Sequence, residues 1–348
     1  MRRAAIALAI TAVALAGCKR QKPPAMTRVW LGAYHGCATV KSGGLECWGA
    51  NDAGQLGDGT KTQSLFPVRV TASPGAPEEL AIGGRHTCGL YAKQIRCWGD
   101  DSRHQLAAPT GATFTVIAAA GDRTCTLGAL GVPQCWGDGH EALATPDGLV
   151  GSASLLAVGP GRVCAAFVAP THDVRCNGAD DRGQSAGQKP VLVGASIKGL
   201  AAGGQHTCAL LEDGSVQCWG DNALGQLGDG STTGSAAPVL VHGLPAAVEI
   251  RANDRTTCAR LWNNTVACWG ANDFHQLANG TTEASARPQP LSGLVGAIEL
   301  SLGGEGACAR LAEGGARCWG RNQAGQMGDG STADHDVPMP VRSPLAKK

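Results

Sequence analysis

The stretch HTCALLEDGSVQCWGDNALGQLGDGS, residues 206 to 231, places two cysteines ten positions apart around an acidic turn and follows them with WG and GQLGDG. The same order of residues recurs along the chain. The second cysteine of each copy is followed by Trp-Gly, or in one case by Asn-Gly, and is found at Cys47, Cys97, Cys135, Cys176, Cys218, Cys268 and Cys318. A period of about 40 to 50 residues indicates a repeat architecture, here of seven units.

Each repeat has the pattern of β-strands. Short β-favouring runs such as VEIRA and TCARL lie between clusters of Gly, Asn, Asp and Pro, and no helical stripe of comparable length is present. The paired cysteines flank about four residues, a turn such as EDGS or WNNT, and about four more, which is the layout of an antiparallel hairpin. Opposed residues in the non-hydrogen-bonded register have Cα atoms roughly 4.5 Å apart, which a disulfide tolerates. We therefore predict seven cross-strand disulfides: Cys37–Cys47, Cys88–Cys97, Cys125–Cys135, Cys164–Cys176, Cys208–Cys218, Cys258–Cys268 and Cys308–Cys318.

These pairs use fourteen of the fifteen cysteines and leave Cys18 over. Two arginines and an apolar run of thirteen residues, Ala4 to Ala16, precede it; this run is too short to span a bilayer and is typical of a signal peptide. The letters LAGC resemble the lipobox of bacterial lipoproteins, in which the cysteine is acylated and becomes the first mature residue. We expect residues 1–17 to be a signal peptide, Cys18 the lipidation site and 18–27 a tether. The alternatives are an uncleaved anchor or a cytosolic start with a chance cysteine.

The leader predicts export and a lipid anchor in the cell envelope, with the protein facing the periplasm or the exterior. Heavy disulfide use agrees with an oxidising compartment. Lys19 stands where enterobacterial lipoproteins retained in the inner membrane carry an aspartate, so the resemblance implies the outer membrane. The tether would hold the folded body within roughly 30 Å of the membrane, at about 3.3 Å per residue.

Charge excludes one large class of partner. The chain has 29 basic and 28 acidic residues, and loss of Arg2 and Arg3 with the leader leaves 27 against 28. Nucleic-acid binding depends on clustered Lys and Arg and on counterion release. We therefore expect no nucleic-acid partner.

The combination of G-x-x-H, C-x-L, CWG-x-N and GQLGDG resembles the repeat of the regulator of chromosome condensation family, a seven-bladed β-propeller, over nearly the whole mature chain. It implies an all-β propeller of seven four-stranded blades over residues 28–345, in which radial repetition leaves short, protected sheet edges. Repeats one, five, six and seven match well. Repeats two, three and four are degraded, and GQLGDG shrinks to HQLAAP or is lost. Family members include nucleotide-exchange factors for small GTPases, chromatin binders and secreted bacterial inhibitors of β-lactamases, because one fold hosts many functions.

Several recurring residues could suggest a ligand site, and each has a structural alternative. One tryptophan per repeat fits packing between blades better than ligand stacking. The histidines two residues before a cysteine lack the close spacing of zinc ligands, and the aspartates of GDG lack the alternating spacing of a calcium loop. These residues are His35, His86 and His206, and Asp58, Asp229 and Asp329. No nucleophile is assembled with a base, so we expect no enzymatic activity, metal or cofactor.

A binding surface is predicted where the first-to-second and third-to-fourth strand loops of each blade share one face. The variable residue ahead of each hairpin is taken as Tyr34, Arg85, Arg123, Arg162, Gln205, Arg255 and Glu305. Four arginines there predict a cationic collar for an acidic or carbonyl-rich protein surface, unless they only solubilise the loops. Because the repeats close into a ring, the short loops of repeats two to four lie next to one another. They would make this side of the binding face lower than the side with the long loops. The candidate partner-binding residues are Tyr34, Arg85, Arg103, Arg123, Arg162 and Arg255.

The function that we predict is a lipid-anchored envelope propeller that acts as a protein–protein interaction scaffold. The alternatives are an exchange-factor-like regulator of a small GTPase and a secreted enzyme inhibitor that resembles the β-lactamase inhibitor propellers. Binding of sugar or peptidoglycan would require exposed aromatic residues at the loop tips. The candidates outside the repeat pattern are few and dispersed: Tyr34, Phe66, Trp262 and Phe274. The sequence leaves ring closure open, since VPMPVRSPL could complete the seventh blade or add a strand to the first.

Overall fold

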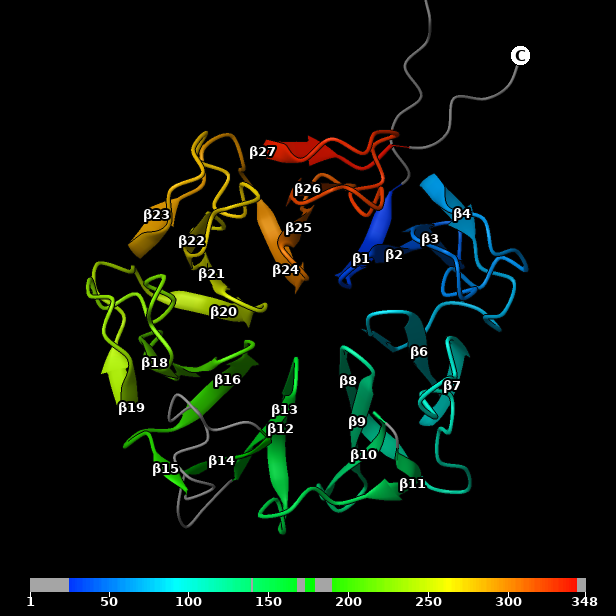
Figure 1. The fold of residues 1–348 in the computed structure, drawn as a ribbon, viewed down its shortest axis with the longest axis horizontal. Helices are drawn as coiled ribbons and strands as arrows, with labels where there is room; N and C mark the ends of the chain where they lie inside the picture. The colour runs from blue at the N-terminus through cyan, green and yellow to red at the C-terminus, as the bar shows by residue number, and fades with distance from the viewer. Residues whose placement is uncertain (1–24, 139, 168–172, 179–189, 343–348) are drawn as a thin grey trace, which may run out of the picture.

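Twenty-seven β-strands surround a central axis in the computed structural model, which describes residues 25–138, 140–167, 173–178 and 190–342 (Figure 1). The predicted signal peptide and residues 18–24 of the predicted tether, with Cys18, lie outside the described residues. The last two residues of that tether, Met26 and Thr27, belong instead to the first strand of the propeller. The strands of the first three blades are β1 (Met26–Leu31), β2 (His35–Val40), β3 (Leu45–Gly49), β4 (Ser64–Arg69), β5 (Glu79–Ile82), β6 (His86–Tyr91), β7 (Gln94–Gly99), β8 (Phe114–Ala120), β9 (Arg123–Gly128), β10 (Pro133–Gly137) and β11 (His140–Ala144). Those of the last four are β12 (Ala153–Gly159), β13 (Arg162–Phe167), β14 (Asp173–Gly178), β15 (Val191–Leu192), β16 (Ile197–Ala202), β17 (His206–Leu211), β18 (Val216–Gly220), β19 (Ser235–Leu240), β20 (Ala247–Ala252), β21 (Thr256–Leu261), β22 (Val266–Gly270), β23 (Ser285–Pro290), β24 (Ala297–Gly303), β25 (Gly306–Leu311), β26 (Ala316–Gly320) and β27 (His335–Pro340).

Each sequence repeat forms one antiparallel sheet, with its strands in chain order from the axis outward. The predicted seven-bladed, all-β propeller is confirmed, and six of its sheets have four strands. Blade two has only β5, β6 and β7. The segment after β7, residues 106–113, contains Pro109 and Gly111 and forms no strand, since both residues weaken sheet pairing. One hydrogen bond from Gln94 Nε2 to the Ala112 carbonyl, 2.8 Å, ties this segment to the blade.

The seven predicted disulfides are all present, and each joins the second and third strands of its blade. The cysteines face each other directly, with Cα atoms 4.0 to 4.1 Å apart, slightly closer than the predicted spacing. They also belong to the core. Cys258 and Cys268, for example, pack with Leu300 and Trp319 of the following blade.

The ring closes without exchange of a strand between its ends. β27 pairs with β26, so the segment VPMP completes the seventh blade. Side chains then join the seventh blade to the first. Trp48 Nε1 donates to the Gln326 carbonyl at 2.8 Å, and the Leu31 amide donates to Ser301 Oγ at 2.8 Å. In Figure 1 the strands β24 and β1 lie next to each other at this junction.

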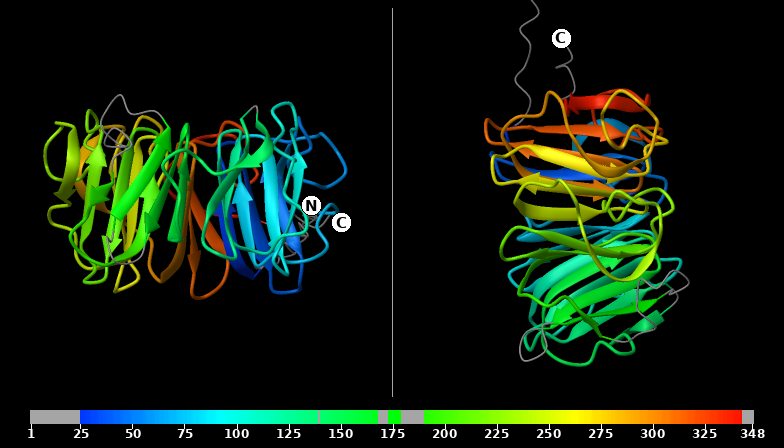
Figure 2. Two further views of the ribbon diagram at one scale, coloured as in Figure 1. Left: turned by 90° about the horizontal axis from the view of Figure 1, so that it is seen from below. Right: turned by 90° about the vertical axis from the view of Figure 1, so that its left-hand side faces the viewer.

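The edge-on views of Figure 2 show a disc with connections on both faces. We call one side the loop face. It carries the first-to-second loops, such as 32–34 and 253–255, and the third-to-fourth loops, such as 50–63. The other side is the turn face, with the hairpin turns between second and third strands and the connections between blades. The described chain begins on the turn face, where the Ala25 carbonyl accepts a hydrogen bond from the Lys41 amide at 2.8 Å.

Candidate functional site

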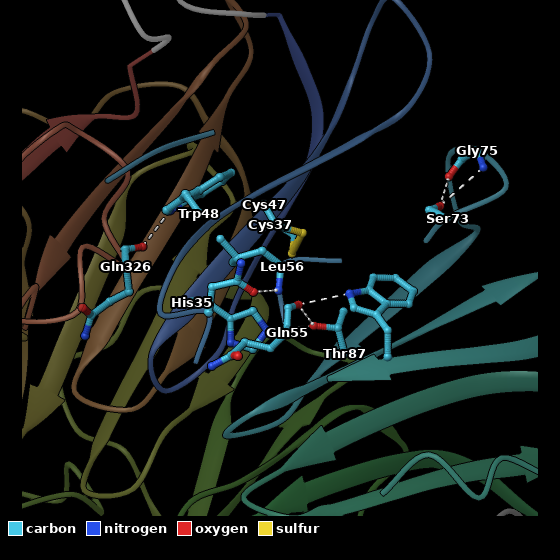
Figure 3. Close-up of a disulfide and its surroundings, with 12 residues drawn as sticks. His35, Cys37, Cys47, Trp48, Gln55, Leu56, Ser73, Gly75, Thr87 and Gln326 are labelled. Atoms are coloured by element: carbon cyan, nitrogen blue, oxygen red, sulfur yellow. Dashed lines mark hydrogen bonds between the residues drawn. A yellow bond between two sulfur atoms is a disulfide. The ribbon is translucent and has the colours of Figure 1, made fainter. Parts of the chain in front are cut away.

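The tryptophan of the CWG motif locks neighbouring blades together. Its side chain is at most 7% exposed in each of the six blades that carry it. In five of these, Nε1 donates to the backbone carbonyl of a glutamine in the preceding blade's loop, over 2.8 to 3.0 Å: Trp48 to Gln326, Trp98 to Gln55, Trp136 to Gln105, Trp269 to Gln226 and Trp319 to Gln276. Figure 3 shows Trp48 directed at Gln326. The structure therefore places these tryptophans between blades, as predicted.

The histidines of the G-x-x-H motif complete the same interfaces. His35 Nε2 lies 2.8 Å from Thr87 Oγ1, and this hydroxyl donates its proton to the Gln55 carbonyl at 2.9 Å (Figure 3). Because a hydroxyl has only one proton, Nε2 must be protonated and must donate to Thr87. Nδ1 is therefore unprotonated, and it has no hydrogen-bond partner among the described residues. Burial, and secondarily the charge of His86, lowers the pKa of His35 to about 3.

Two further histidines repeat this arrangement. His206 Nε2 lies 2.7 Å from Thr257 Oγ1, and His86 Nε2 lies 2.7 Å from Thr124 Oγ1. Burial lowers the pKa of His206 to about 3 and that of His86 to about 4. The three imidazoles are thus neutral links between blades. Over the described ranges of the chain, no group of three or more His, Cys, Asp or Glu side chains is placed to hold a metal ion.

The Asn and Asp of the long loops fasten those loops internally. Asn51 Oδ1 accepts the Leu56 amide at 3.0 Å, and Asn51 Nδ2 donates to Asp58 Oδ1 at 3.1 Å. Asp58 Oδ1 also accepts the Thr60 amide at 2.9 Å. Although its partial burial alone would raise the pKa of Asp58, the hydrogen bonds from Thr60 and Asn51 outweigh it and lower the pKa. The GDG aspartate therefore caps a turn.

The glycine of the WG motif joins the two sets of loops on the loop face. Gly49 has a φ of 105°, which favours glycine, and a Cβ there would lie 2.5 Å from the Tyr34 carbonyl oxygen. This close approach lets the Ala50 amide donate to the Tyr34 carbonyl at 2.9 Å. The same bond recurs between the two loops of blades two, three, five, six and seven. The positions of the first-to-second loops are therefore fixed by the backbone.

These backbone bonds correct the predicted collar at two positions. The residue that occupies the place of Tyr34 in blade three is Asp122, not Arg123, because the Asp138 amide donates to the Asp122 carbonyl. Arg123 and Arg162 instead stand opposite the WG or NG glycine, as His35 does. The first-to-second loops have the same length in all seven blades, because each cysteine of the second strand pairs with the residue seven positions before it. The count to the cysteine therefore identifies equivalent residues: both arginines lie two residues before it, as His35 does, whereas Tyr34 and Arg85 lie three residues before it.

Arg162 was predicted to be on the surface, and this prediction is wrong. Its side chain is fully buried between blades four and five, where it takes the role of the histidine. Nη1 donates to Thr207 Oγ1 at 3.2 Å, and Nη2 donates to the Gly204 carbonyl. A buried guanidinium that makes these bonds is part of the propeller core.

The other collar arginines do lie on the loop face, and each is paired with a carboxylate. Arg85 Nη2 lies 2.6 Å from Asp52 Oδ2, and Arg255 Nη2 lies 3.0 Å from Asp273 Oδ2. Arg103 Nε lies 3.3 Å from Asp122 Oδ2, and Arg123 Nη2 lies 2.8 Å from Asp138 Oδ2. The predicted cationic surplus is thus absent from these four positions. The collar is a ring of ion pairs, and Tyr34 is 44% exposed beside it.

A cavity of 320 Å³ opens inside the collar. The first-to-second loops form its rim, and its wall consists largely of glycine and alanine with Tyr34, Arg85, Asp122 and Asp254 at the edge. Burial raises the pKa of Asp254. An adjoining cavity of 320 Å³ continues between the innermost strands. Near its far end Arg28 bridges Glu79 at 2.9 Å and Glu299 at 3.2 Å.

Models of the regulator of chromosome condensation repeat match residues 42–90, 197–226, 213–260 and 313–348. These segments carry the regulator of chromosome condensation repeat. Two animal proteins illustrate how far the likeness extends. Human E3 ubiquitin-protein ligase HERC2 is 29% identical over 232 residues, which are 61% of this chain and 4% of that protein. Rat probable E3 ubiquitin-protein ligase HERC4 is 28% identical over 223 residues, 63% of this chain and 19% of that protein. The chain thus spans less than a fifth of these relatives.

Solved structures agree with the family's fold. Prp20p of Saccharomyces cerevisiae superposes with a TM-score of 0.72 at 16% identity, over 93% of this chain and 88% of Prp20p. Human WBSCR16 gives a TM-score of 0.73 at 17% identity, over 85% of this chain and 94% of WBSCR16. At such low identity the likeness establishes the fold of this repeat-family propeller and nothing further.

Proposed function

We propose that this propeller is a lipid-anchored scaffold of the cell envelope that binds a protein partner on its loop face. The collar of exposed ion pairs around the central cavity carries the proposal. Arg85, Arg103 and Arg255 have side chains that are 39 to 58% exposed. Exposed ion pairs are worth only about 0 to 1 kcal/mol each, so a partner can exchange them for pairs of its own at little cost. Arginine and tyrosine are also the residue types that are enriched at interface hot spots.

The ion pairs between the collar arginines and aspartates indicate what kind of surface the partner has. A surface of free arginines would select an acidic protein, whereas here each arginine brings an aspartate with it. We therefore propose a partner surface of mixed charge, which meets arginine with carboxylate and aspartate with lysine or arginine. A projecting side chain of the partner could enter the central cavity, whose glycine and alanine wall leaves room for it.

Membrane attachment through Cys18 is the second part of the proposal and is based on the leader. No helix of the described residues is long and apolar enough to cross a membrane. Seven disulfides support an oxidising compartment outside the cytosol, where thiols are kept reduced. No catalytic role is proposed, since the collar pairs its ionisable groups with one another.

A second candidate is an exchange-factor-like regulator of a small GTPase. Its support is the fold of Prp20p, which is described with binding properties toward Gsp1p and histones. The disulfides favour the envelope scaffold over this candidate, because such a GTPase is cytosolic. An inhibitor of a secreted enzyme would use the same loop face and would differ in silencing a measurable activity.

The test is a crosslinking pulldown from intact envelopes with the native protein and a loop-face variant, Tyr34→Ala/Arg85→Ala/Arg255→Ala. The matched control changes exposed residues of the turn face, Lys93→Ala/Glu212→Ala. We expect a discrete envelope protein with the native chain and the control, and its loss with the loop-face variant. Equal recovery with all three would contradict binding at the loop face. Recovery of a small GTPase instead would favour the second candidate.

A further inference from the structure

The turn face carries two patches of exposed apolar side chains. The first consists of Leu130, 81% exposed in the turn between β9 and β10, and Val150, 72% exposed in the connection from β11 to β12. The two segments touch, because the Ala153 amide donates to the Gly131 carbonyl at 2.9 Å. This patch lies where blade three meets blade four.

The second patch lies across the ring, where blade six meets blade seven. Trp262 is 68% exposed in the turn between β21 and β22, and Val295 is 80% exposed in the connection from β23 to β24. These segments also touch, since the Ala297 amide donates to the Asn264 carbonyl at 3.0 Å. Large apolar side chains on a folded surface mark a place of contact when they gather on one face.

Besides the two apolar patches, the start of the described chain at Ala25 also lies on the turn face. Ala25 bonds to the turn of blade one through Lys41, and a Cβ built on Gly314 in the turn of blade seven would lie 3.9 Å from it. Only seven peptide steps separate Ala25 from Cys18, which reach at most about 25 Å. The three points lie at separate places around the ring in Figure 1, so together they define the plane of the turn face.

We infer that the turn face rests on the lipid surface to which Cys18 is attached, with the two apolar patches in the interfacial layer, so that the loop face points away from the membrane. This inference rests on the proposed lipid anchor. Tryptophan prefers the interface between water and lipid. A short tether also gives a high effective concentration, so patches too small to bind lipid alone make contact once the chain is anchored.

The charges of the turn face favour apolar contact over attraction to anionic headgroups. The hairpin turns that the structure describes carry the exposed lysines Lys41 and Lys93 but also the exposed carboxylates Glu212, Asp213 and Glu313. A surface of mixed sign gains little from an anionic membrane, which is bound through clustered basic residues. Contact of the turn face with lipid should therefore persist at high salt.

Trp262 is a built-in probe for this contact. The other seven tryptophans are at most 7% exposed, so Trp262 supplies the tryptophan emission that solvent or lipid can quench directly. The lipidated protein is incorporated into vesicles of phosphatidylethanolamine and phosphatidylglycerol with brominated acyl chains. We expect quenching of the native protein, loss of that quenching in Trp262→Phe, and no reversal by high salt.

Two further variants separate the possible results. Leu130→Glu/Val150→Glu should weaken the quenching of Trp262 although it leaves the probe in place, whereas the loop-face control Tyr34→Glu should not. A vesicle-bound protein whose Trp262 stays unquenched would overturn the seating of the turn face and leave the anchor intact. If the native protein and Cys18→Ala both stay off the vesicles, the anchor and the seating fail together.

Discussion

Blades five, six, seven and one differ from blades two, three and four in their loops and keep the same hairpin. The first group has long third-to-fourth loops, in which Asn51, Asn222, Asn272 and Asn322 fasten the loop. In the second group, blade two lacks a fourth strand, and β11 begins only three positions after the end of β10. Every blade keeps its disulfide and a glycine with positive φ as the last residue of the third strand. The disulfide-linked hairpin is therefore the indispensable unit of the repeat, and the loops are the part that varies.

The lock between blades, the hydrogen bond from a tryptophan indole to a glutamine carbonyl of the preceding blade, is kept by Trp98 and Trp136 of blades two and three, but blade four has no tryptophan to form it. Blade four has Asn177 in place of tryptophan, and the preceding blade has no glutamine loop to receive an indole. A cleft of 180 Å³, lined by Arg123, Trp136, Asp147 and Asn177, lies at this interface. The donor and the acceptor of the lock are thus absent together, which leaves no unpaired carbonyl for the missing indole.

The largest expected effect tests this lock directly. Trp269→Ala should lower the free energy of unfolding by about 3 to 5 kcal/mol, because it empties a fully buried site and removes the bond to the Gln226 carbonyl. Asn177→Ala, at the same position of blade four, should cost less than about 1 kcal/mol, since its bond to the Asp147 carbonyl is exposed. Denaturant unfolding measures both. Equal losses would show that the two interfaces are equally tight.

Disulfide removal should give the next largest effect and should not distinguish the two groups. Chain entropy predicts a loss of about 2 to 3 kcal/mol for Cys208→Ala/Cys218→Ala and for Cys164→Ala/Cys176→Ala, because the linked residues are separated by 10 and 12 positions. Thermal and denaturant unfolding of the two double variants provide the comparison. A much larger loss in blade four would mean that the degraded blade depends on its disulfide to fold.

Acid should weaken the blade interfaces that contain histidine. Since the pKa of buried His35, His86 and His206 is about 3 to 4 and that of an unfolded histidine is about 6.5, unfolding takes up protons below pH ~6.5. Stability is therefore complete above this pH and falls as the pH drops toward 3 to 4, by roughly 2 to 3 kcal/mol per histidine at pH ~4.5.

Unfolding midpoints measured from pH 7 to 4.5 test this expectation. His206→Gln should make the dependence shallower, because a glutamine amide can donate to Thr257 and does not titrate. Arg162 occupies the corresponding site of blade four and keeps its charge throughout this range. An unfolding midpoint that is independent of pH in the native protein would disprove the neutral histidine link.

The smallest expected effect on stability concerns the collar. Arg85→Ala and Arg255→Ala should each change the free energy of unfolding by less than about 1 kcal/mol, because the ion pairs are exposed. Arg162→Ala serves as the contrast and should cost several times more, since it removes a buried hydrogen-bonding group. Chemical denaturation distinguishes them. A large loss from Arg85→Ala would assign that arginine to the fold instead of the binding surface.

The repeat period and the cysteine spacing were sufficient to predict the blades, the hairpins and the disulfides, because all of these are local in sequence. The collar was predicted less well. Arg162 was misplaced because it lies two residues before its cysteine, at the interface position of the histidine, and not three residues before it, at the exposed position of Tyr34. The ion pair of Arg85 was not foreseen, since Asp52 lies 33 residues earlier and comes from another blade. Contacts between blades depend on ring geometry, which a single repeat does not encode.

The closure of the ring by β27 within its own blade means that the sequence repeat and the structural repeat are in phase. Duplication or deletion of one such segment of the gene would add or remove an entire blade and would leave no strand without its neighbour. The seam between the chain ends has the same kind of lock, Trp48 to Gln326, as the seams within the chain. By its construction, therefore, the ring has no privileged place for its ends, and its blades can change in number or diverge one at a time.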